Sequence, residues 1–336
     1  MIATAIEVVN PQRGVRCQFE ALGTLNTITV YGRADDALLD CAVNRVLEID
    51  SKMSAFKASS DISRLNRSAG RESVKLSPET ISLLCLAKTF GTLSGGAFDV
   101  TVRPLAELWG IGKKHNFIPT RNERDEAAKL VCDQDLVINR EDSTAYLKRP
   151  KQAVDLGGIA KGYAADEVKR ILIEGGVASA LVNLGGNIVA IGTHPDGKPW
   201  RIGVQNPAAA TGEYLGVLSV ADKTVVTPGS NEQFFMKDGV RHHHILDPRT
   251  GAPARSGLLS VTAICDRSAR ADALTTAVFV LGMEQGMKLL QKCNTGAVFV
   301  MEDLQVFATE GLLTDFSMSN TKKQQSLGGN HEDRQI

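Results

Sequence analysis

Asp272 and Thr276 have the residue types and the spacing that metal chemistry requires. They stand four positions apart in ADALTTA (271–277), a stretch that predicts a helix, so their side-chain oxygens should lie on one helix face. A carboxylate and a hydroxyl suit a hard cation such as Mg²⁺, which takes its other ligands from water and substrate phosphates. The same spacing also fits a structural role, with Asp272 near the helix N-terminus and Thr276 hydrogen-bonded to its own backbone.

A glycine-rich stretch, VDLGGIAKGYAAD (154–166), is the second candidate. Its glycines permit a close backbone approach, and a helix that follows them would direct its first N–H groups towards an anion. Lys161 would neutralise a phosphate as a point charge. The stretch is not a P-loop, because its lysine precedes the last glycine and no Ser or Thr follows. The structural alternative is a tight turn between a strand and a helix.

Three consecutive histidines open HHHILDPRTG (242–251). Neighbouring residues of a strand point to opposite faces, so His242, His243 and His244 cannot all bind one ion. His244 is a candidate general base near neutral pH. For His242 and His243 the sequence favours a packed or solvated strand histidine, and this alternative also applies to His244.

Two further stretches carry polar and aromatic residues at possible turns. In SGGAFDVTVRPLAELWG (94–110), the glycine pair and Asp99 would allow hydrogen bonds to a heterocycle or ribose. The same pattern is also typical of a helix end followed by the start of a strand. MSAFKASSDISRLNR (53–67) is by itself typical of a surface loop.

The surrounding sequence predicts a mixture of helices and strands that would position these residues. Apolar periodicity and caps predict helices over 35–51, after Ser77, after Tyr163, and over 269–282 followed by a second helix at 284–293. Residues 113–135 predict an exposed connection with a short helix. Alternating or apolar runs predict strands at 25–32, 178–192 (two strands around a glycine turn), 200–204, 214–220, 258–265 and 297–309 (a hairpin). Because no regular βαβ order appears, the expected fold class is α+β, with mixed sheets flanked by helices.

Composition excludes several classes of function. Lysine plus arginine balances aspartate plus glutamate at 38 each, and aromatic residues are 5% of the chain, so nucleic acid is not an expected partner. No run reaches the roughly 18 apolar residues of a spanning helix, so no membrane insertion is expected. The six scattered cysteines predict reduced, buried thiols, with Cys41 and Cys85 inside apolar helical patterns. With no visible export signal, the expected location is cytoplasmic.

Taken together and in order, these stretches resemble the FAD:protein FMN transferases, once described as thiamine-biosynthesis lipoproteins. The resemblance runs from about Phe19 to Phe316. It rests on seven motifs: ALGT (21–24), MSAFKASSDISRLNR, SGGAFDVTVRPLAELWG, VDLGGIAKGYAAD, LVNLGGNIVAIG (181–192), HHHILDPRTG and ADALTTAVFVLG (271–282). It implies a transferase domain at 17–316, preceded by an N-terminal extension at 1–16. The polar residues 317–336 predict a disordered C-terminal tail.

The resemblance implies a flavin transferase that requires Mg²⁺. Such an enzyme cleaves FAD and transfers FMN to a Thr or Ser hydroxyl of a target flavoprotein through a phosphoester bond, releasing AMP. Two alternatives stay open: a magnesium-dependent FAD pyrophosphatase that yields FMN and AMP, and a flavin carrier that binds FAD without turnover.

The resemblance also assigns roles to individual positions. His244 matches the base for the acceptor hydroxyl, and Lys161 is a phosphate partner. The metal ligands would be the Ala160 carbonyl, Asp272, Thr275 and Thr276. The FAD site would include Leu22, Phe56, Ala97, Phe98, Asp99, Gly157, Tyr163 and Leu246. One departure is VVTPGSNEQFF (225–235), where Pro228 replaces a serine and Gln233 falls near an arginine of the family pattern; altered anion contacts or acceptor docking are expected there.

Overall fold

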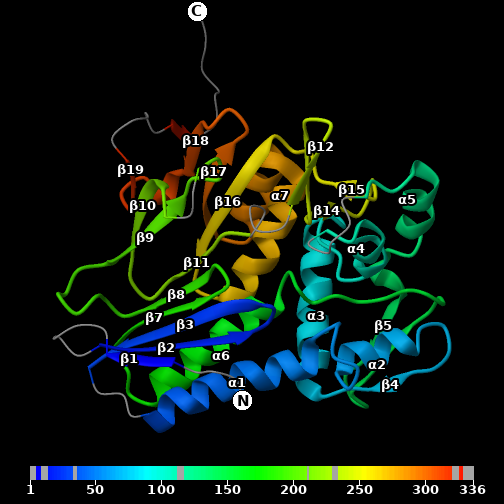
Figure 1. The fold of residues 1–336 in the computed structure, drawn as a ribbon, viewed down its shortest axis with the longest axis horizontal. Helices are drawn as coiled ribbons and strands as arrows, with labels where there is room; N and C mark the ends of the chain where they lie inside the picture. Colours follow the sequence, from blue (N-terminus) through cyan, green and yellow to red (C-terminus); the bar gives the residue numbers. More distant parts are fainter. Residues whose placement is uncertain are drawn as a thin grey trace, which may run out of the picture.

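A ten-stranded sheet is the largest layer of the structure (Figure 1). The computed structural model describes residues 5–8, 14–32, 36–111, 117–209, 212–228, 234–319 and 325–327. Neighbouring strands are antiparallel except the last pair, and their order is β1 (Ala5–Val8), β2 (Gly14–Ala21), β3 (Thr24–Tyr31), β7 (Ser179–Leu184), β8 (Asn187–Ile191), β11 (Thr224–Val226), β16 (Leu258–Cys265), β17 (Gly296–Met301), β18 (Val306–Thr309) and β20 (Gln325–Leu327). The predicted strand pair at 178–192 and the predicted hairpin at 297–309 are confirmed.

Both faces of the central sheet are covered. Val189 of β8 belongs to the main core, which the sheet forms with helices, whereas the next residue, Ala190, packs with Trp200 and Ile202 on the opposite face. The helices on the first face are α1 (Asp36–Met53), α6 (Ala160–Glu174) and α7 (Ser268–Lys292). The second face is covered by a small sheet of β9 (Trp200–Gln205), β10 (Tyr214–Val220) and β19 (Phe316–Met318). The expected α+β class is therefore confirmed.

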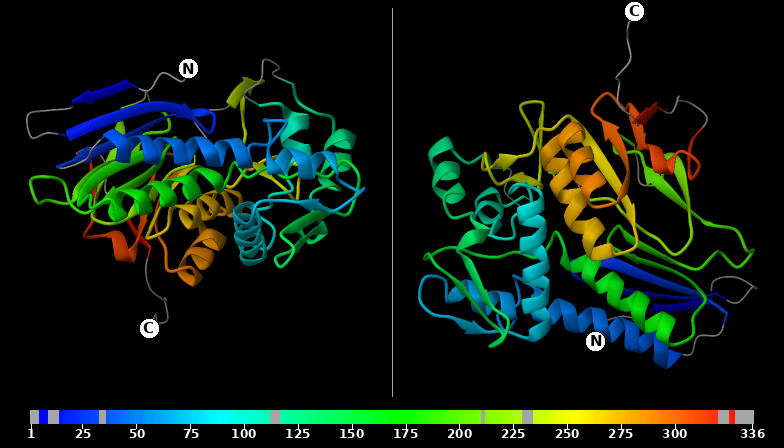
Figure 2. Two further views of the ribbon diagram at one scale, coloured as in Figure 1. Left: turned by 90° about the horizontal axis from the view of Figure 1, so that it is seen from below. Right: turned by 180° about the vertical axis from the view of Figure 1, so that it is seen from behind.

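A second group of shorter elements lies around helix α3 (Pro78–Leu93), at the right of the large sheet in Figure 1 and on the matching side in Figure 2. The α3 N-terminus forms as the sequence predicts, because the Ser77 side chain accepts the Thr80 N–H and Pro78 occupies the first turn. The group contains α2 (Asp61–Arg67), α4 (Arg103–Trp109), α5 (Arg121–Ala128), β4 (Val74–Lys75), β5 (Leu136–Asn139), β6 (Thr144–Leu147), and the pairs β12 (Phe234–Lys237)–β13 (Val240–His243) and β14 (Leu246–Asp247)–β15 (Ala252–Pro253), while 3₁₀ turns occur at Asp133–Asp135 and Glu310–Leu312.

Helix α6 begins earlier than the sequence predicts. The sequence predicts its start after Tyr163, and glycine is in general unfavourable inside a helix. Gly162 nevertheless lies inside the first turn for a packing reason: a Cβ atom there would sit 2.3 Å from the carbonyl oxygen of Ser268 at the start of α7. The two helices predicted over 269–293 are confirmed as the two parts of α7, which is interrupted at Gly282 (φ 79°, ψ 176°).

Two aspartates connect the first turns of α6 and α7. Asp166 of α6 accepts hydrogen bonds from the backbone N–H groups of Ser268 (2.8 Å) and Ala269 (3.1 Å), which begin α7. In return, Asp272 of α7 accepts the Gly162 N–H of α6 at 2.9 Å. Each helix therefore satisfies N-terminal donors of the other, and a carboxylate is favourable at both positively polarised ends.

The prediction of buried thiols is correct for Cys17 and Cys265 only. All six cysteines are free, but Cys41 is exposed, and Cys85, Cys132 and Cys293 are partly exposed. Cys41 is exposed because the buried stripe of α1 runs through Leu39, Ala42, Val43 and Val46, which leaves position 41 on the outer face.

Two other expectations concern the chain ends and the membrane. Of the expected tail at 317–336, residues in β19 pair with β10, and β20 pairs with β18; its remaining residues from 320 to 324 and from 328 lie outside the described ranges, as do 1–4 and 9–13 of the N-terminal extension. None of the helices in the described part of the chain combines the length and apolar character that a bilayer-spanning helix needs.

We predict that Asp166→Ala lowers the free energy of unfolding by about 1–3 kcal/mol, because two N-terminal amides of α7 lose their acceptor. Urea denaturation followed by circular dichroism measures this change. The matched control is Glu284→Ala, which removes an exposed ion pair with Lys288 on the same helix and should cost less than about 1 kcal/mol. Equal stability of the two variants would contradict the role given to Asp166.

Candidate functional site

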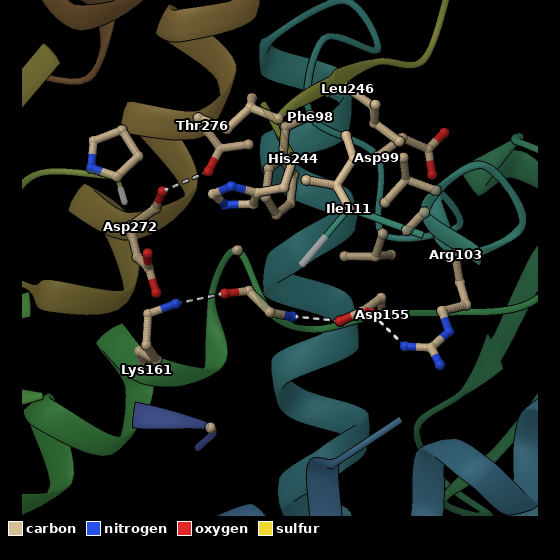
Figure 3. A pocket seen from close by; sticks show the side chains of 18 of the residues that line it. Phe98, Asp99, Arg103, Ile111, Asp155, Lys161, His244, Leu246, Asp272 and Thr276 are labelled. Atoms are coloured by element: carbon tan, nitrogen blue, oxygen red, sulfur yellow. Dashed lines mark hydrogen bonds and ion pairs between the residues drawn. The ribbon is translucent and has the colours of Figure 1, made fainter. Parts of the chain in front are cut away.

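A cavity of about 390 Å³ lies where the ends of the sheet strands, α6, α7 and the α3–α4 region meet (Figure 3). Its walls come from distant parts of the sequence. They include the β2–β3 turn, residues 97–111, the glycine turn before α6, the β7–β8 turn, residues 227–228 after β11, residues 244–248, and α7. Most of the candidate residues found in the sequence thus contribute to one site.

Asp272 and Thr276 line one wall of this cavity from α7. The Thr276 hydroxyl donates to the Asp272 backbone oxygen at 3.3 Å, and the buried Thr275 hydroxyl donates to the same oxygen at 2.9 Å. The backbone bonding expected from the structural alternative is therefore present. It does not exclude cation binding, because a hydroxyl that donates its hydrogen keeps lone pairs on its oxygen. Thr275 does not itself line the cavity.

The glycine turn faces the same wall from the start of α6. Gly158 lies against both sides of the site, since a Cβ atom there would be 3.1 Å from the Phe98 ring and 3.4 Å from the Thr276 hydroxyl. The Lys161 ammonium bonds the Gly157 carbonyl oxygen at 2.9 Å, as Figure 3 shows. Gly157, Gly158 and Lys161 line the cavity, whereas Ala160 lies beside it in the first helical turn.

An ion pair on the other side of the glycine turn was not identified from the sequence. Asp155 accepts a hydrogen bond from the Gly157 N–H at 2.9 Å and another from the Arg103 guanidinium, also at 2.9 Å. Arg103 is buried, bonds Glu107 at 2.7 Å, and lies over the ring of Phe56 with 4.2 Å to its centroid. These contacts tie the turn to α4 (Figure 3). Both residues lie within the motifs described above, but nothing in the sequence indicates that they form an ion pair.

Asp99 reaches the cavity, yet the protein already occupies its carboxylate. One oxygen accepts the Thr101 backbone N–H (2.7 Å) and hydroxyl (2.6 Å), and the other accepts the Asp133 N–H (3.1 Å). Burial raises the pKa of Asp99 above the usual aspartate range, although the Thr101 bonds oppose that shift. Asp99 therefore holds the segment after α3 in place.

The three consecutive histidines have three different surroundings. His242 stacks against Phe235, with ring centroids 4.9 Å apart, and against Trp109. His243 contacts the edge of Phe279 and its Nε2 bonds the Ala254 oxygen at 3.0 Å, and burial lowers its pKa to about 4. His244 alone is exposed and lines the cavity. This agrees with the expectation that the three cannot share one ion.

Of the other residues predicted for the FAD site, all but Tyr163 line the cavity. Leu22, Phe56, Ala97, Phe98, Gly157 and Leu246 line the cavity together with Asp99, and His244. Tyr163 does not line it: its hydroxyl bonds Glu79 at 2.7 Å, and burial raises its pKa. Of the divergent segment 225–235, Thr227 and Pro228 line the cavity and residues 229–233 lie outside the described part of the chain.

The cavity offers oxygen donors rather than a dense metal cluster. Within the described ranges, no group of three or more His, Cys, Asp and Glu side chains could hold an ion. Asp272 and Thr276 are hard oxygen donors, which suit Mg²⁺ better than a softer metal. Two protein ligands fit a cation that completes its shell with water and substrate phosphates, so the donor chemistry is compatible with Mg²⁺.

Comparison with known proteins identifies the family. The model of the ApbE family matches residues 22–300. A protein of Klebsiella pneumoniae (strain 342) is 33% identical over 284 residues, covering 84% of this chain and 88% of that protein; one of Treponema pallidum (strain Nichols) is 35% identical over 311 residues, covering 87% and 86%. Both are named FAD:protein FMN transferase.

Solved structures agree with this result. The ApbE protein of Thermotoga maritima has a TM-score of 0.82 at 30% identity, covering 94% of this chain and 99% of that chain. The flavin transferase ApbE of Vibrio cholerae has a TM-score of 0.81 at 28% identity, covering 91% and 100%. On the family match over most of its length, together with these relatives, the chain belongs to the ApbE family and is a transferase enzyme.

Proposed function

We propose that this enzyme transfers FMN from FAD to a Thr or Ser hydroxyl of an acceptor flavoprotein, in a reaction that requires Mg²⁺ and releases AMP. One observation supports this above the others: the glycine turn of α6, the oxygens of α7 and the imidazole of His244 border a single cavity. The names of the relatives support FAD as the donor and a protein as the acceptor.

In the proposed reaction the acceptor oxygen attacks the phosphorus on the flavin side of the FAD diphosphate. A new phosphoester bond forms, the bond from that phosphorus to the bridging oxygen breaks, and the bridging oxygen leaves as part of AMP. His244 takes the proton of the acceptor hydroxyl. Because phosphoryl transfer needs little covalent help from a protein, most of the rate gain would come from positioning and charge stabilisation.

The α6 end of the cavity would bind the diphosphate. The positively polarised N-terminus of this 15-residue helix favours an anion, and Lys161 adds a positive charge beside Gly157. Asp272 and Thr276 would hold Mg²⁺, with Thr275 and the Ala160 carbonyl as further ligands that the family resemblance implies. The ion would neutralise charge on the leaving AMP.

The apolar lining would contact the rings of FAD. Ala97, Phe98 and Leu246 offer apolar surface inside the cavity, and Leu22 borders it at the β2–β3 turn. Phe56 is 72% exposed, and the Arg103 guanidinium on one of its faces holds it at the cavity edge. A flat exposed ring in this position suits stacking on a heterocycle. Tyr163, bonded to Glu79, would act only through the placement of α6.

The decisive experiment incubates the protein with FAD, Mg²⁺ and a flavoprotein domain that carries an acceptor Thr, followed by mass spectrometry. We expect the mass of one FMN on the acceptor and one AMP released per transfer. Free FMN and AMP without any labelled acceptor would instead indicate the pyrophosphatase. Intact FAD after long incubation, despite binding, would indicate a flavin carrier.

The cytoplasmic location stays a prediction from the sequence.

We predict that Asp272→Asn abolishes magnesium-dependent turnover, reducing it by more than the 10–100-fold typical of outer-shell changes at metal sites. The asparagine can still accept the Gly162 N–H but carries no charge, so the helix junction is kept while cation affinity falls. Titration of activity with Mg²⁺ measures the effect. Asp266→Asn, which removes a surface pair with Lys223, is the control. Undiminished turnover in Asp272→Asn would remove Asp272 from the cation site.

We predict that His244→Ala slows transfer by about 10²–10⁴-fold, the usual contribution of a general base, while FAD affinity changes little. Single-turnover kinetics and FAD titration separate the two quantities. The exposed His194, which pairs with Asp196, provides the control variant His194→Ala. A parallel loss of affinity and rate in His244→Ala would make His244 a binding residue instead of a base.

A further inference from the structure

Asn187 lines the cavity and carries a buried amide nitrogen without a hydrogen-bond partner among the described residues. It is the first residue of β8, directly after the Gly185–Gly186 turn, and its side chain is 1% exposed. Its amide nitrogen Nδ2 has no hydrogen-bond partner in the described part of the chain, and Asn187 is the one cavity-lining residue there with such an atom. A buried donor without an acceptor is costly, and native proteins rarely leave one unpaired. A ligand in the cavity would supply the missing acceptor once the Asn187 side chain turns its amide nitrogen towards the cavity that it lines.

The sheet register places Asn187 at the Asp272 end of the cavity. Asn187 pairs directly with Val226 of β11, and Val226 packs in a small cluster with Ala271, which precedes Asp272. Thr227, the next residue after Val226, also lines the cavity. Asn187 therefore belongs to the wall that the α7 oxygens form, facing the region reached by the glycine turn.

The surroundings determine which ligand atom suits this amide. An Nδ2 group only donates, so its partner must be an acceptor oxygen or nitrogen. The positive groups at this end, the α6 N-terminus and Lys161, favour an anion there. Because the amide of Asn187 is neutral, it offers a donor to an anion at this wall. A carboxylate in its place would add a second negative charge beside Asp272 and would repel the anion.

We propose that Asn187 binds the diphosphate of the flavin nucleotide, by donating a hydrogen bond from Nδ2 to an anionic oxygen. The assignment rests on the proposed function, since it takes FAD as the occupant of the cavity. Asn187 is then a substrate-recognition residue that distinguishes nucleotides carrying a diphosphate from flavins without one. It adds a donor to a wall whose positive charge comes from Lys161 and the N-terminus of α6.

The test measures binding of FAD, ADP and riboflavin by calorimetry without added divalent cations, so that the cation site does not contribute. The proteins are the wild type, Asn187→Leu, which removes the donor at similar volume, and Asn187→Asp, which replaces the donor by a charged acceptor. We expect Asn187→Leu to weaken FAD and ADP about 10–100-fold, as for a lost hydrogen bond to a charged group. Riboflavin binding should stay unchanged. Asn187→Asp should weaken FAD and ADP further through repulsion.

Thr224→Val is the matched control, because Thr224 is equally buried in the same strand pair and bonds the Ile188 oxygen, but does not line the cavity. It should lower stability without changing any of the three affinities. If Asn187→Leu does not fold, Asn187→Asp carries the test. Unchanged FAD and ADP affinities, or an equal loss for all three ligands, would overturn the proposal. FAD binding by the wild type without any FMN transfer would refute the proposed function alone.

Discussion

The site depends on the contact between the first turns of α6 and α7. Asp166 and Asp272 each accept backbone N–H groups from the opposite helix, so the two N-termini must lie side by side. The contact also requires a glycine at position 162, since any side chain would overlap the Ser268 carbonyl. Without this junction, the glycine turn and the Asp272–Thr276 pair, more than a hundred residues apart in the sequence, would have no reason to meet.

The second constraint acts across the cavity. The Arg103–Asp155 pair joins α4 to the glycine turn, and Asp155 in turn accepts the Gly157 N–H. Arg103 is buried, and its positive charge is compensated there by Asp155 and Glu107. The turn is therefore held from both sides: by α7 through Asp272, and by α4 through Arg103. Such rigidity favours preorganised donors, which bind an anion without a cost of reorganisation at the moment of reaction.

The sequence predicted the elements well where a local signal defines them. Ser77 and Pro78 mark the start of α3, and the glycine pair of LVNLGGNI marks the β7–β8 turn, because caps and turns act over a few residues. The start of α6 was misplaced, since the reason for Gly162 is a contact with a helix far along the chain. The exposed position of Cys41 was not predicted, because apolar neighbours in the sequence do not determine which face of the helix the cysteine side chain occupies.

The site residues that a local motif defines could also be predicted, whereas those defined by a distant contact could not. Asp272, Thr276, His244 and Lys161 could be selected by type and motif, and all four line the cavity. Arg103 and Asp155 could not, because an ion pair between residues 52 positions apart leaves no pattern in a sequence. Asn187 could not be selected either, because its amide nitrogen stands out only by having no hydrogen-bond acceptor, and this can be seen only in the folded structure. Tyr163 belongs to a family motif but bonds Glu79 instead of facing the cavity.

The cavity lining extends from Leu22 to Thr276, so the site has no local precursor in the chain. Its walls come together only after strands and helices with large sequence separations have paired, which are the slow and entropically costly steps of folding. Occupancy is then linked to the folding equilibrium of the whole domain: a ligand that binds only the native state stabilises every element that contributes a wall. FAD in the cell would therefore act as a folding ligand for this enzyme as well as its substrate.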